Sequence, residues 1–313
     1  MTAAPAGRIA VTGATGTLGS ALVRELAARG HRPLALVRPG RAGGVVAAAD
    51  PVEAAADPVE AELGDGGPEA VRRLAEALSD TRALFLLTPF HPRQDLLQRT
   101  VIEAAAAAGV AHVVKLSALG ADPESPVLVH RQHGLAERAL ADRGVAHTVL
   151  RPNAFTQNAA QWLGTIASRG AVLLPVGRAR VSMVDVRDIA AAAATLLIGR
   201  PGHGEAYELT GPRALTYAEA AEELTAASGR RIRYLDVSED VAREAMLGAG
   251  VPAWAVAARL QLYATYTAGE AETVSGALRE LTGRPPRPFA DFARLLAERI
   301  RALPAPGPAE AAR

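Results

Sequence analysis

Strand-like and helix-like segments alternate along the first half of this chain of 313 residues. Short apolar runs predict six strands, at 8–12, 33–37, 59–63, 83–87, 112–116 and 147–151. Apolar residues at helical spacing predict helices at 19–29, 69–78, 94–108 and 127–143. Such alternation implies parallel strands joined by right-handed crossovers, with helices on both faces of the sheet. The sequence therefore predicts an α/β fold built on a Rossmann doubly wound parallel sheet, whose ligands bind beyond the carboxyl ends of the strands.

A glycine-rich loop joins the first predicted strand to the first predicted helix. Gly13, Gly16 and Gly19 recur there at three-residue intervals. A turn this tight needs residues without Cβ crowding, and a pyrophosphate can then approach the backbone N–H groups and the positive end of the helix. We interpret the loop as a dinucleotide-binding site rather than a chance glycine-rich turn. The cofactor-binding residues expected here are Thr12, Gly13, Thr15, Gly16, Thr17, Leu18 and Gly19.

The ends of the next strands indicate which dinucleotide is bound. Arg38 ends the second predicted strand, with Arg41 close by, where an NAD-selective site would place a carboxylate. A guanidinium there complements a 2′-phosphate, so we expect NADPH; the alternative is an ordinary solvated arginine. Asp65, after the third strand, is expected near the adenine or in a plain turn. Thr88 and Pro89, after the fourth, are expected near the nicotinamide-side ribose.

Composition narrows the classes of function. The 34 basic and 33 acidic side chains give a net charge of +1, so no global field favours nucleic acid or an anionic membrane. Cysteine is absent, which excludes thiolate chemistry and cysteine-ligated metals, and we expect no metal site. Lys115 is the only lysine. With no signal peptide pattern and no spanning segment, we expect a soluble cytoplasmic protein.

The pattern of segments changes after Arg151. Strands are predicted at 171–175, 181–184 and 205–209, and helices at 186–198, 217–228, 238–247 and 252–266. We expect residues 1–151 to form mainly the NAD(P)-binding domain. Residues 152–300 should form mainly a smaller C-terminal substrate-binding lobe, with some strands and helices returning to the Rossmann part. The Pro- and Gly-containing segment 301–313 predicts a flexible tail.

Motifs spread over the whole chain are similar to those of one family. They are the loop 12–19, Lys-Leu-Ser-Ala at 115–118, His-Gly-Leu-Ala-Glu at 133–137, Leu-Arg-Pro-Asn-Ala-Phe-Thr-Gln-Asn at 150–158, Val-Asp-Val-Arg-Asp-Ile at 184–189 and the segment 281–293. Together they resemble the NmrA-like atypical short-chain dehydrogenases/reductases, in particular their NAD(P)H:quinone oxidoreductase-like and azoreductase-like branch. The resemblance extends from residue 8 to about residue 297 and implies the Rossmann fold and NAD(P) binding.

The chain departs from the wider superfamily at its catalytic motif. Ordinary members use a serine and a Tyr-x-x-x-Lys helix turn followed by a glutamate. Anchored on Glu137, that pattern places Val129 at the tyrosine and His133 at the lysine, while Ser117 matches the serine. We predict Ser117 and His133 as catalytic residues. Ser117 would polarise the acceptor oxygen, and His133 would be a proton source or ribose ligand; the alternative for His133 is a structural histidine.

Two further side chains near this motif have open roles. His130 faces the same question as His133, with less support for a catalytic role. Lys115 shares a strand face with Ser117 and would orient a ribose or carboxamide, but we favour a partly exposed strand residue without catalytic role.

Substrate-binding residues are expected in the loop after the sixth strand, at Asn153, Phe155 and Gln157. The predicted function is an NADPH-dependent reductase that transfers hydride to a conjugated small molecule, a quinone or an aromatic or polyketide ketone. Such acceptors form stabilised anions, so they tolerate the missing tyrosine. The alternative is a non-catalytic NAD(P)-sensing regulator of the NmrA type; an NAD-dependent epimerase fits less well. We expect a monomer or homodimer that binds neither nucleic acid nor membrane.

Overall fold

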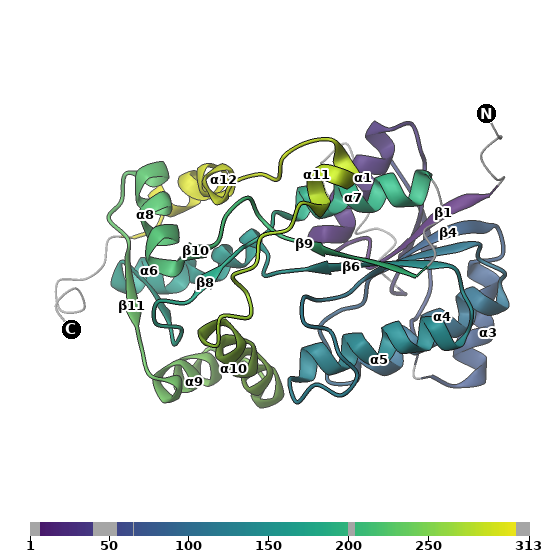
Figure 1. The fold of residues 1–313 in the computed structure, drawn as a ribbon, viewed down its shortest axis with the longest axis horizontal. Helices are drawn as coiled ribbons and strands as arrows, with labels where there is room; N and C mark the ends of the chain where they lie inside the picture. The colour runs from purple at the N-terminus through teal and green to yellow at the C-terminus, as the bar shows by residue number, and fades with distance from the viewer. Residues whose placement is uncertain (1–6, 40–54, 65, 200–203, 305–313) are drawn as a thin grey trace. The chain divides into compact units, whose positions relative to one another are not determined.

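The computed structural model describes residues 7–39, 55–64, 66–199 and 204–304. The chain divides into two compact units, and each is built from several segments. The first unit comprises Met1–Arg151, Val186–Glu208 and Glu280–Gly283. The second unit comprises Pro152–Asp185, Leu209–Arg279 and Arg284–Arg313. Figure 1 shows the elements of each unit along the chain.

A seven-stranded parallel sheet, of order β3-β2-β1-β4-β5-β6-β9, is the framework of the first unit. Its strands are β1 (Arg8–Thr12), β2 (Leu34–Val37), β3 (Asp57–Glu60), β4 (Thr81–Leu86), β5 (His112–Leu116), β6 (His147–Pro152) and β9 (Glu205–Leu209). β9 runs parallel to β6, because Gly204 N–H bonds the His147 carbonyl and Asn153 N–H bonds the Leu209 carbonyl. The predicted doubly wound sheet is confirmed.

Helices cover both faces of this sheet (Figure 1). On one face α1 (Thr17–Ala28) packs against α7 (Val186–Ile198), which also contacts β4 and β5. On the other face lie α3 (Pro68–Ala77), α4 (Gln94–Ala107) and α5 (Leu128–Asp142), whose apolar side chains share one core with the sheet. Burial on both faces explains why the central strands are apolar throughout rather than alternating.

The strand predicted at 59–63 is displaced in the structure. β3 spans Asp57–Glu60 and pairs with β2 from Leu34↔Asp57 to Val37↔Glu60. Pro58 argues against a strand in the sequence, but β3 is the edge strand, where a residue without an N–H is tolerated.

The second unit has its own core and two small sheets. β7 (Ala171–Leu174) pairs in parallel with β11 (Arg233–Asp236), and β8 (Arg180–Val181) pairs antiparallel with β10 (Leu215–Thr216). The helices are η2 (Thr156–Trp162), α6 (Leu163–Arg169), α8 (Tyr217–Ser228), α9 (Glu239–Gly248), α10 (Ala253–Thr267) and α12 (Phe289–Arg301). The short α11 (Ala277–Thr282) is divided: its first half belongs to this unit and its second half, from Glu280, to the first unit. Trp162 belongs to this core and stacks on Phe289, with 6.4 Å between the ring centroids.

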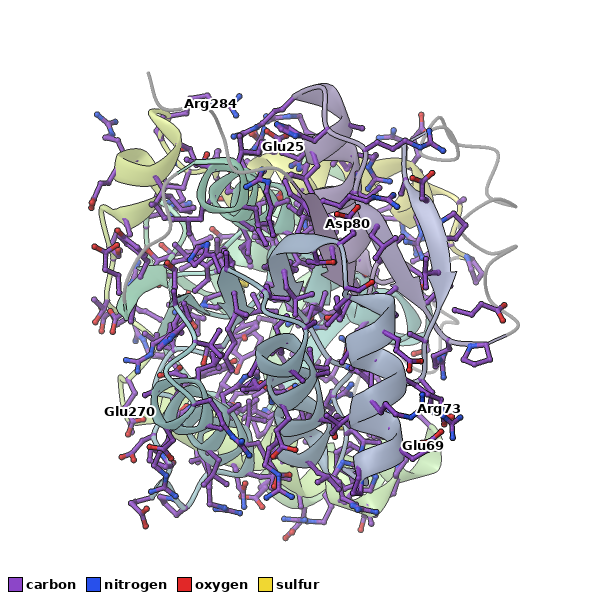
Figure 2. All side chains as sticks on the ribbon, turned by 90° about the vertical axis from the view of Figure 1, so that its right-hand side faces the viewer. Glu25, Glu69, Arg73, Asp80, Glu270 and Arg284 are labelled. Atoms are coloured by element: carbon purple, nitrogen blue, oxygen red, sulfur yellow. The ribbon has the colours of Figure 1, made fainter. Side chains whose placement is uncertain are left out.

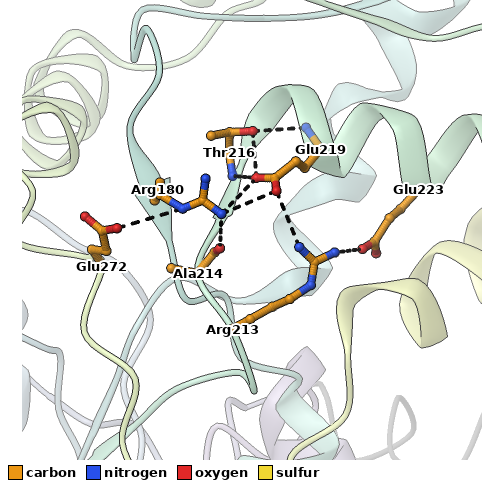
Figure 3. Close-up of polar contacts among 7 residues, drawn as sticks. All are labelled: Arg180, Arg213, Ala214, Thr216, Glu219, Glu223 and Glu272. Carbon is orange, nitrogen blue, oxygen red and sulfur yellow. Dashed lines mark hydrogen bonds and ion pairs between the residues drawn. The ribbon is translucent and has the colours of Figure 1, made fainter.

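A polar network fixes the start of α8 in the second unit (Figure 3). Thr216 and Glu219 form a capping box, in which Glu219 accepts from the Thr216 N–H at 2.7 Å. Arg180 and Arg213 pair with the same carboxylate at 3.3 and 3.5 Å. These hydrogen bonds, led by the one from the Thr216 backbone, lower the pKa of Glu219. The capping box makes the helix begin at Tyr217, and the helix start predicted there is confirmed.

Candidate active site

The loop after β1 needs glycine at Gly13, Gly16 and Gly19 for different structural reasons. Gly13 has φ +64°, which side chains other than glycine rarely adopt. Gly16 donates its N–H to the Gly13 carbonyl at 3.0 Å and closes the turn. A Cβ on Gly19 would lie 2.1 Å from the Gly13 oxygen, so only glycine lets α1 pack this closely on the loop.

Thr12 supports this loop from the sheet side. Its buried hydroxyl donates to the Leu87 carbonyl at 2.8 Å and accepts from the Leu87 N–H at 2.8 Å. The hydroxyl therefore ties β1 to the end of β4. Its expected contact with a cofactor stays a prediction.

The N-terminus of α1 is open. Thr15, Gly16 and Thr17 are exposed, while the side chain of Leu18 is buried. Gly16 is the N-cap, no side chain caps the helix, and the first turn has no acidic residue. The first N–H groups of a helix lack intrahelical partners, and the helix dipole favours an anion there. A backbone cradle that a Cβ would narrow, facing an uncapped helix, fits a pyrophosphate.

Arg38 follows β2 at the same edge of the sheet. Its side chain is exposed, and no described residue pairs with its guanidinium. It is therefore available to a ligand phosphate. Arg41 and Asp65, the other two residues considered at this end, lie outside the described residues.

A cavity of about 770 Å³ opens beyond β2 and β3. Pro39 after β2, residues after β3, the first half of α3 and the start of α4 line it. Glu69 and Arg73 of α3, which pair at 2.9 Å, belong to this lining (Figure 2). The cavity lies where the sequence predicts the adenine end of a dinucleotide.

Thr88 and Pro89 follow β4, as predicted, but differ in exposure. Thr88 is buried, and its hydroxyl accepts from Gln94 Nε2 at 3.2 Å. Pro89 is exposed. Only Pro89 therefore has a side chain open to a ligand, and Thr88 positions the start of α4.

Ser117 belongs to a buried polar cluster. It is 3% exposed, and its hydroxyl donates to Glu137 Oε1. Arg151 of β6 holds the same carboxylate with two bonds, Nε to Oε1 at 3.2 Å and Nη2 to Oε2 at 2.5 Å. The Ser117 proton therefore points at Glu137 and not toward a ligand. Polarisation of an acceptor oxygen by Ser117, as expected from the sequence, would require the hydroxyl to turn.

The structure overturns the expectation that Lys115 is partly exposed. Lys115 is fully buried, and its Nζ contacts the Leu116 carbonyl at 3.1 Å and His133 Nδ1 at 3.0 Å. A lysine in a central strand of a sheet that helices cover on both faces has no direct contact with water, so it uses polar partners inside the protein. Burial lowers its pKa to about 7; Glu137 opposes this shift, and Arg151 adds to it.

His133 and His130 face into the same region from α5. Burial, together with the neighbouring Lys115 and His130, holds the pKa of His133 well below its ordinary value. His133 is therefore a neutral imidazole at physiological pH. His130 is also buried, beside Gly120.

Sequence reasoning missed two members of this cluster, Glu137 and Arg151. Glu137 lies four residues after His133, on the same helix face, so a buried carboxylate beside a buried histidine was readable from the spacing. Arg151 carried no such signal, because its contact depends on how α5 packs across β5 and β6.

The expected substrate residues lie in the second unit, with different surroundings. The Asn153 amide is fully used: Nδ2 donates to Ser182 Oγ at 2.9 Å and to the Ala271 carbonyl at 2.8 Å, and Oδ1 accepts from the Ala154 N–H at 2.8 Å. The Asn153 side chain therefore holds its loop in place through partners within the protein, and its contact with a substrate stays a prediction. Phe155 and Gln157 are partly exposed at η2.

Comparison with known proteins identifies the family. The NmrA-like family profile matches residues 5–286. The chain is 38% identical to the NAD(P)H azoreductase of Xenophilus azovorans, over 91% of this chain and 96% of the relative. It is 36% identical to a (4-alkanoyl-5-oxo-2,5-dihydrofuran-3-yl)methyl phosphate reductase of Streptomyces griseus, over 93% of this chain and 98% of the relative.

A solved structure agrees with these relatives. The Escherichia coli NADPH-dependent quinone oxidoreductase QOR2, complexed with NADPH, superposes with a TM-score of 0.79 at 29% identity, covering 92% of this chain and 99% of that one. The chain belongs to the NmrA-like family. Its relatives include an azoreductase and a quinone oxidoreductase, which agrees with the branch that the motifs indicated.

Two features are absent from the described part of the chain. None of its helices combines the length and the hydropathy needed to span a bilayer. No group of three or more potential ligands among His, Cys, Asp and Glu gathers within it.

Proposed function

We propose that this protein is an NADPH-dependent reductase of conjugated small molecules, such as quinones and aromatic or polyketide ketones. One observation carries the proposal: the glycine cradle faces an uncapped helix N-terminus, in a chain that is 38% identical to an azoreductase over 91% of its length. NADPH, when bound, supplies the hydride. The similar QOR2 structure contains NADPH, which supports the same cofactor here.

The chain's own residues divide the remaining tasks. The backbone N–H groups of Thr15, Gly16 and Thr17 would hold the pyrophosphate, and Arg38 the 2′-phosphate. His133, neutral and largely excluded from water, would give a proton to the acceptor oxygen. Residues 1–151 would bind the cofactor, and residues 152–300, with Phe155 and Gln157, would cover the acceptor. We further propose a cytoplasmic monomer or homodimer that needs neither nucleic acid nor membrane.

The protein is expected to oxidise NADPH in the presence of a conjugated acceptor. Absorbance of NADPH should fall when the protein meets quinones, aromatic ketones or azo dyes. Replacing both Ser117 and His133 by alanine should lower kcat about 100-fold, because a positioned acid is lost, and should leave the NADPH Kd nearly unchanged. Silence of the wild-type protein across the acceptor panel, with tight NADPH binding, would favour a cofactor-sensing regulator instead.

Arg38 is expected to make the protein prefer NADPH over NADH. Arg38→Asp should weaken NADPH binding by about 10- to 100-fold and barely change NADH binding, since a charge-assisted contact with the 2′-phosphate is replaced by repulsion. Isothermal titration with both cofactors measures this. Arg294→Asp, on the exposed side of α12, makes the same charge change in the second unit and serves as the control. An equal loss for both cofactors would refute the assignment.

A further inference from the structure

We propose that Lys115 and His133 form a proton relay in which the buried lysine supplies, through the imidazole, the proton that the acceptor oxygen takes up. Lys115 is a positioning residue and proton reservoir, and His133 is the group that meets the ligand. The relay rests on the proposed reductase function. It would stand in for the tyrosine and helix lysine that are missing from this chain.

The contact between the two side chains fixes the direction of the relay. Lys115 Nζ lies 3.0 Å from His133 Nδ1 and 3.1 Å from the Leu116 carbonyl. An ammonium group only donates, so a charged Lys115 makes Nδ1 the acceptor and leaves the imidazole hydrogen on Nε2. No described residue bonds Nε2, and His133 keeps 7% exposure. Nε2 is therefore the end of the relay that a ligand can reach.

The surroundings make this proton transferable. Burial lowers the pKa of Lys115 to about 7, so its ammonium gives up a proton far more easily than an exposed lysine. His133 is held neutral by burial, by Lys115 and by His130, so it cannot keep a second proton and must release one as it accepts another. Glu137 and Arg151, the other charged groups facing the pair, neutralise each other in their ion pair.

The identity of residue 115 supports the same conclusion. Every other basic side chain counted among the 34 lysines and arginines is an arginine. Arginine remains protonated in proteins, so it could donate to Nδ1 but could not release its proton. Position 115 thus carries the one basic side chain that can both donate to Nδ1 and become neutral by losing a proton.

The proposed step balances in atoms and charge. Once hydride transfer has placed negative charge on the acceptor oxygen, the Nε2–H bond breaks and an O–H bond forms. At the same time a Lys115 N–H bond breaks and an Nδ1–H bond forms. Oxygen anion and lysine cation become a neutral hydroxyl and a neutral amine, and His133 stays neutral as the other tautomer. After product release, a water proton returns to Lys115 by the same path.

A spectroscopic test needs no turnover. At pH 6, ¹⁵N chemical shifts of wild-type His133 should show a protonated Nε2 and an unprotonated Nδ1, and Lys115→Met should lose this fixed tautomer. A wild-type His133 with its proton on Nδ1 at pH 6 would overturn the relay even if no variant folds. Lys115→Arg should keep the wild-type tautomer, because it still donates.

A kinetic test separates the relay from the function. Wild-type kcat with a quinone should fall as pH rises through about 7 and show a curved proton inventory in mixed H₂O and D₂O. Lys115→Met and Lys115→Arg should lose about 10- to 100-fold in kcat, with a flat pH profile and nearly unchanged NADPH Kd. Turnover that keeps its rate and pH profile in both variants overturns the relay alone. Absence of wild-type turnover with every acceptor overturns the function and the relay together.

Discussion

Gly19→Ala is expected to lose both stability and affinity for NADPH. The added Cβ would lie 2.1 Å from the Gly13 oxygen, 2.7 Å from the Gly13 carbon and 2.9 Å from the Ala14 Cα. All three are backbone atoms, so no side chain can turn aside and α1 must move away from the loop. We expect a loss of about 3 kcal/mol in the free energy of unfolding. A shift of about 1 Å in the N–H groups that face the pyrophosphate should raise the NADPH Kd about 100-fold.

Three other glycines serve as controls for this variant. Gly248 of α9 and Gly164 of α6 have open space at the Cβ position, so alanine there should keep or slightly raise stability. Gly16→Ala meets only the Gly13 oxygen, at 3.3 Å, and should weaken NADPH binding with less loss of stability. Urea unfolding and isothermal titration measure both quantities. Wild-type values for Gly19→Ala in both would show that this close packing is unnecessary.

The sequence was a good guide wherever a local signal was strong. β5 and β9 begin and end at the predicted residues, as do α7 and α8. Buried apolar residues mark β5 and α7, and a capping box marks the start of α8. α12 was missed although its buried residues Phe289, Ala293, Leu296 and Ile300 follow helical spacing. No element was predicted for this segment, and the helix is stabilised by packing against α8, which no local pattern reveals.

The candidate site was less predictable, because its chemistry depends on contacts between elements. Strand alternation correctly placed Lys115 and Ser117 on one face of β5, but lysine is rarely fully buried, and exposure was the reasonable expectation. The contact with His133 exists only because α5 covers that face. The Asn153 amide shows a second limit: the motif loop predicts a substrate contact, which stays a prediction, but it does not reveal the partners Ala154, Ser182 and Ala271.

Lys115→Met is expected to change how stability depends on pH. The pKa of Lys115 is about 7 in the folded protein, against an ordinary lysine value of 10.5. Between these values the unfolded chain binds a proton that the folded chain does not, so raising the pH favours the folded state. The wild-type free energy of unfolding should therefore gain up to about 1.4 kcal/mol per pH unit above pH 7 from this residue. Well below pH 7 Lys115 is protonated in both the folded and the unfolded state, so the free energy of unfolding no longer changes with pH through this residue, and the folded state carries the full cost of burying the charge.

Methionine removes this titration and retains most of the side-chain volume. The stability advantage of Lys115→Met over the wild type should thus be largest below pH 7 and shrink by up to about 3 kcal/mol between pH 7 and 9.5. Urea unfolding across that range measures it, ending before tyrosines titrate. Leu116→Met, in the same strand, alters packing without removing a charge and should give a small, pH-independent difference. Parallel curves for wild type and Lys115→Met would mean that burial does not lower the pKa of Lys115, whatever the protein's cofactor or substrate.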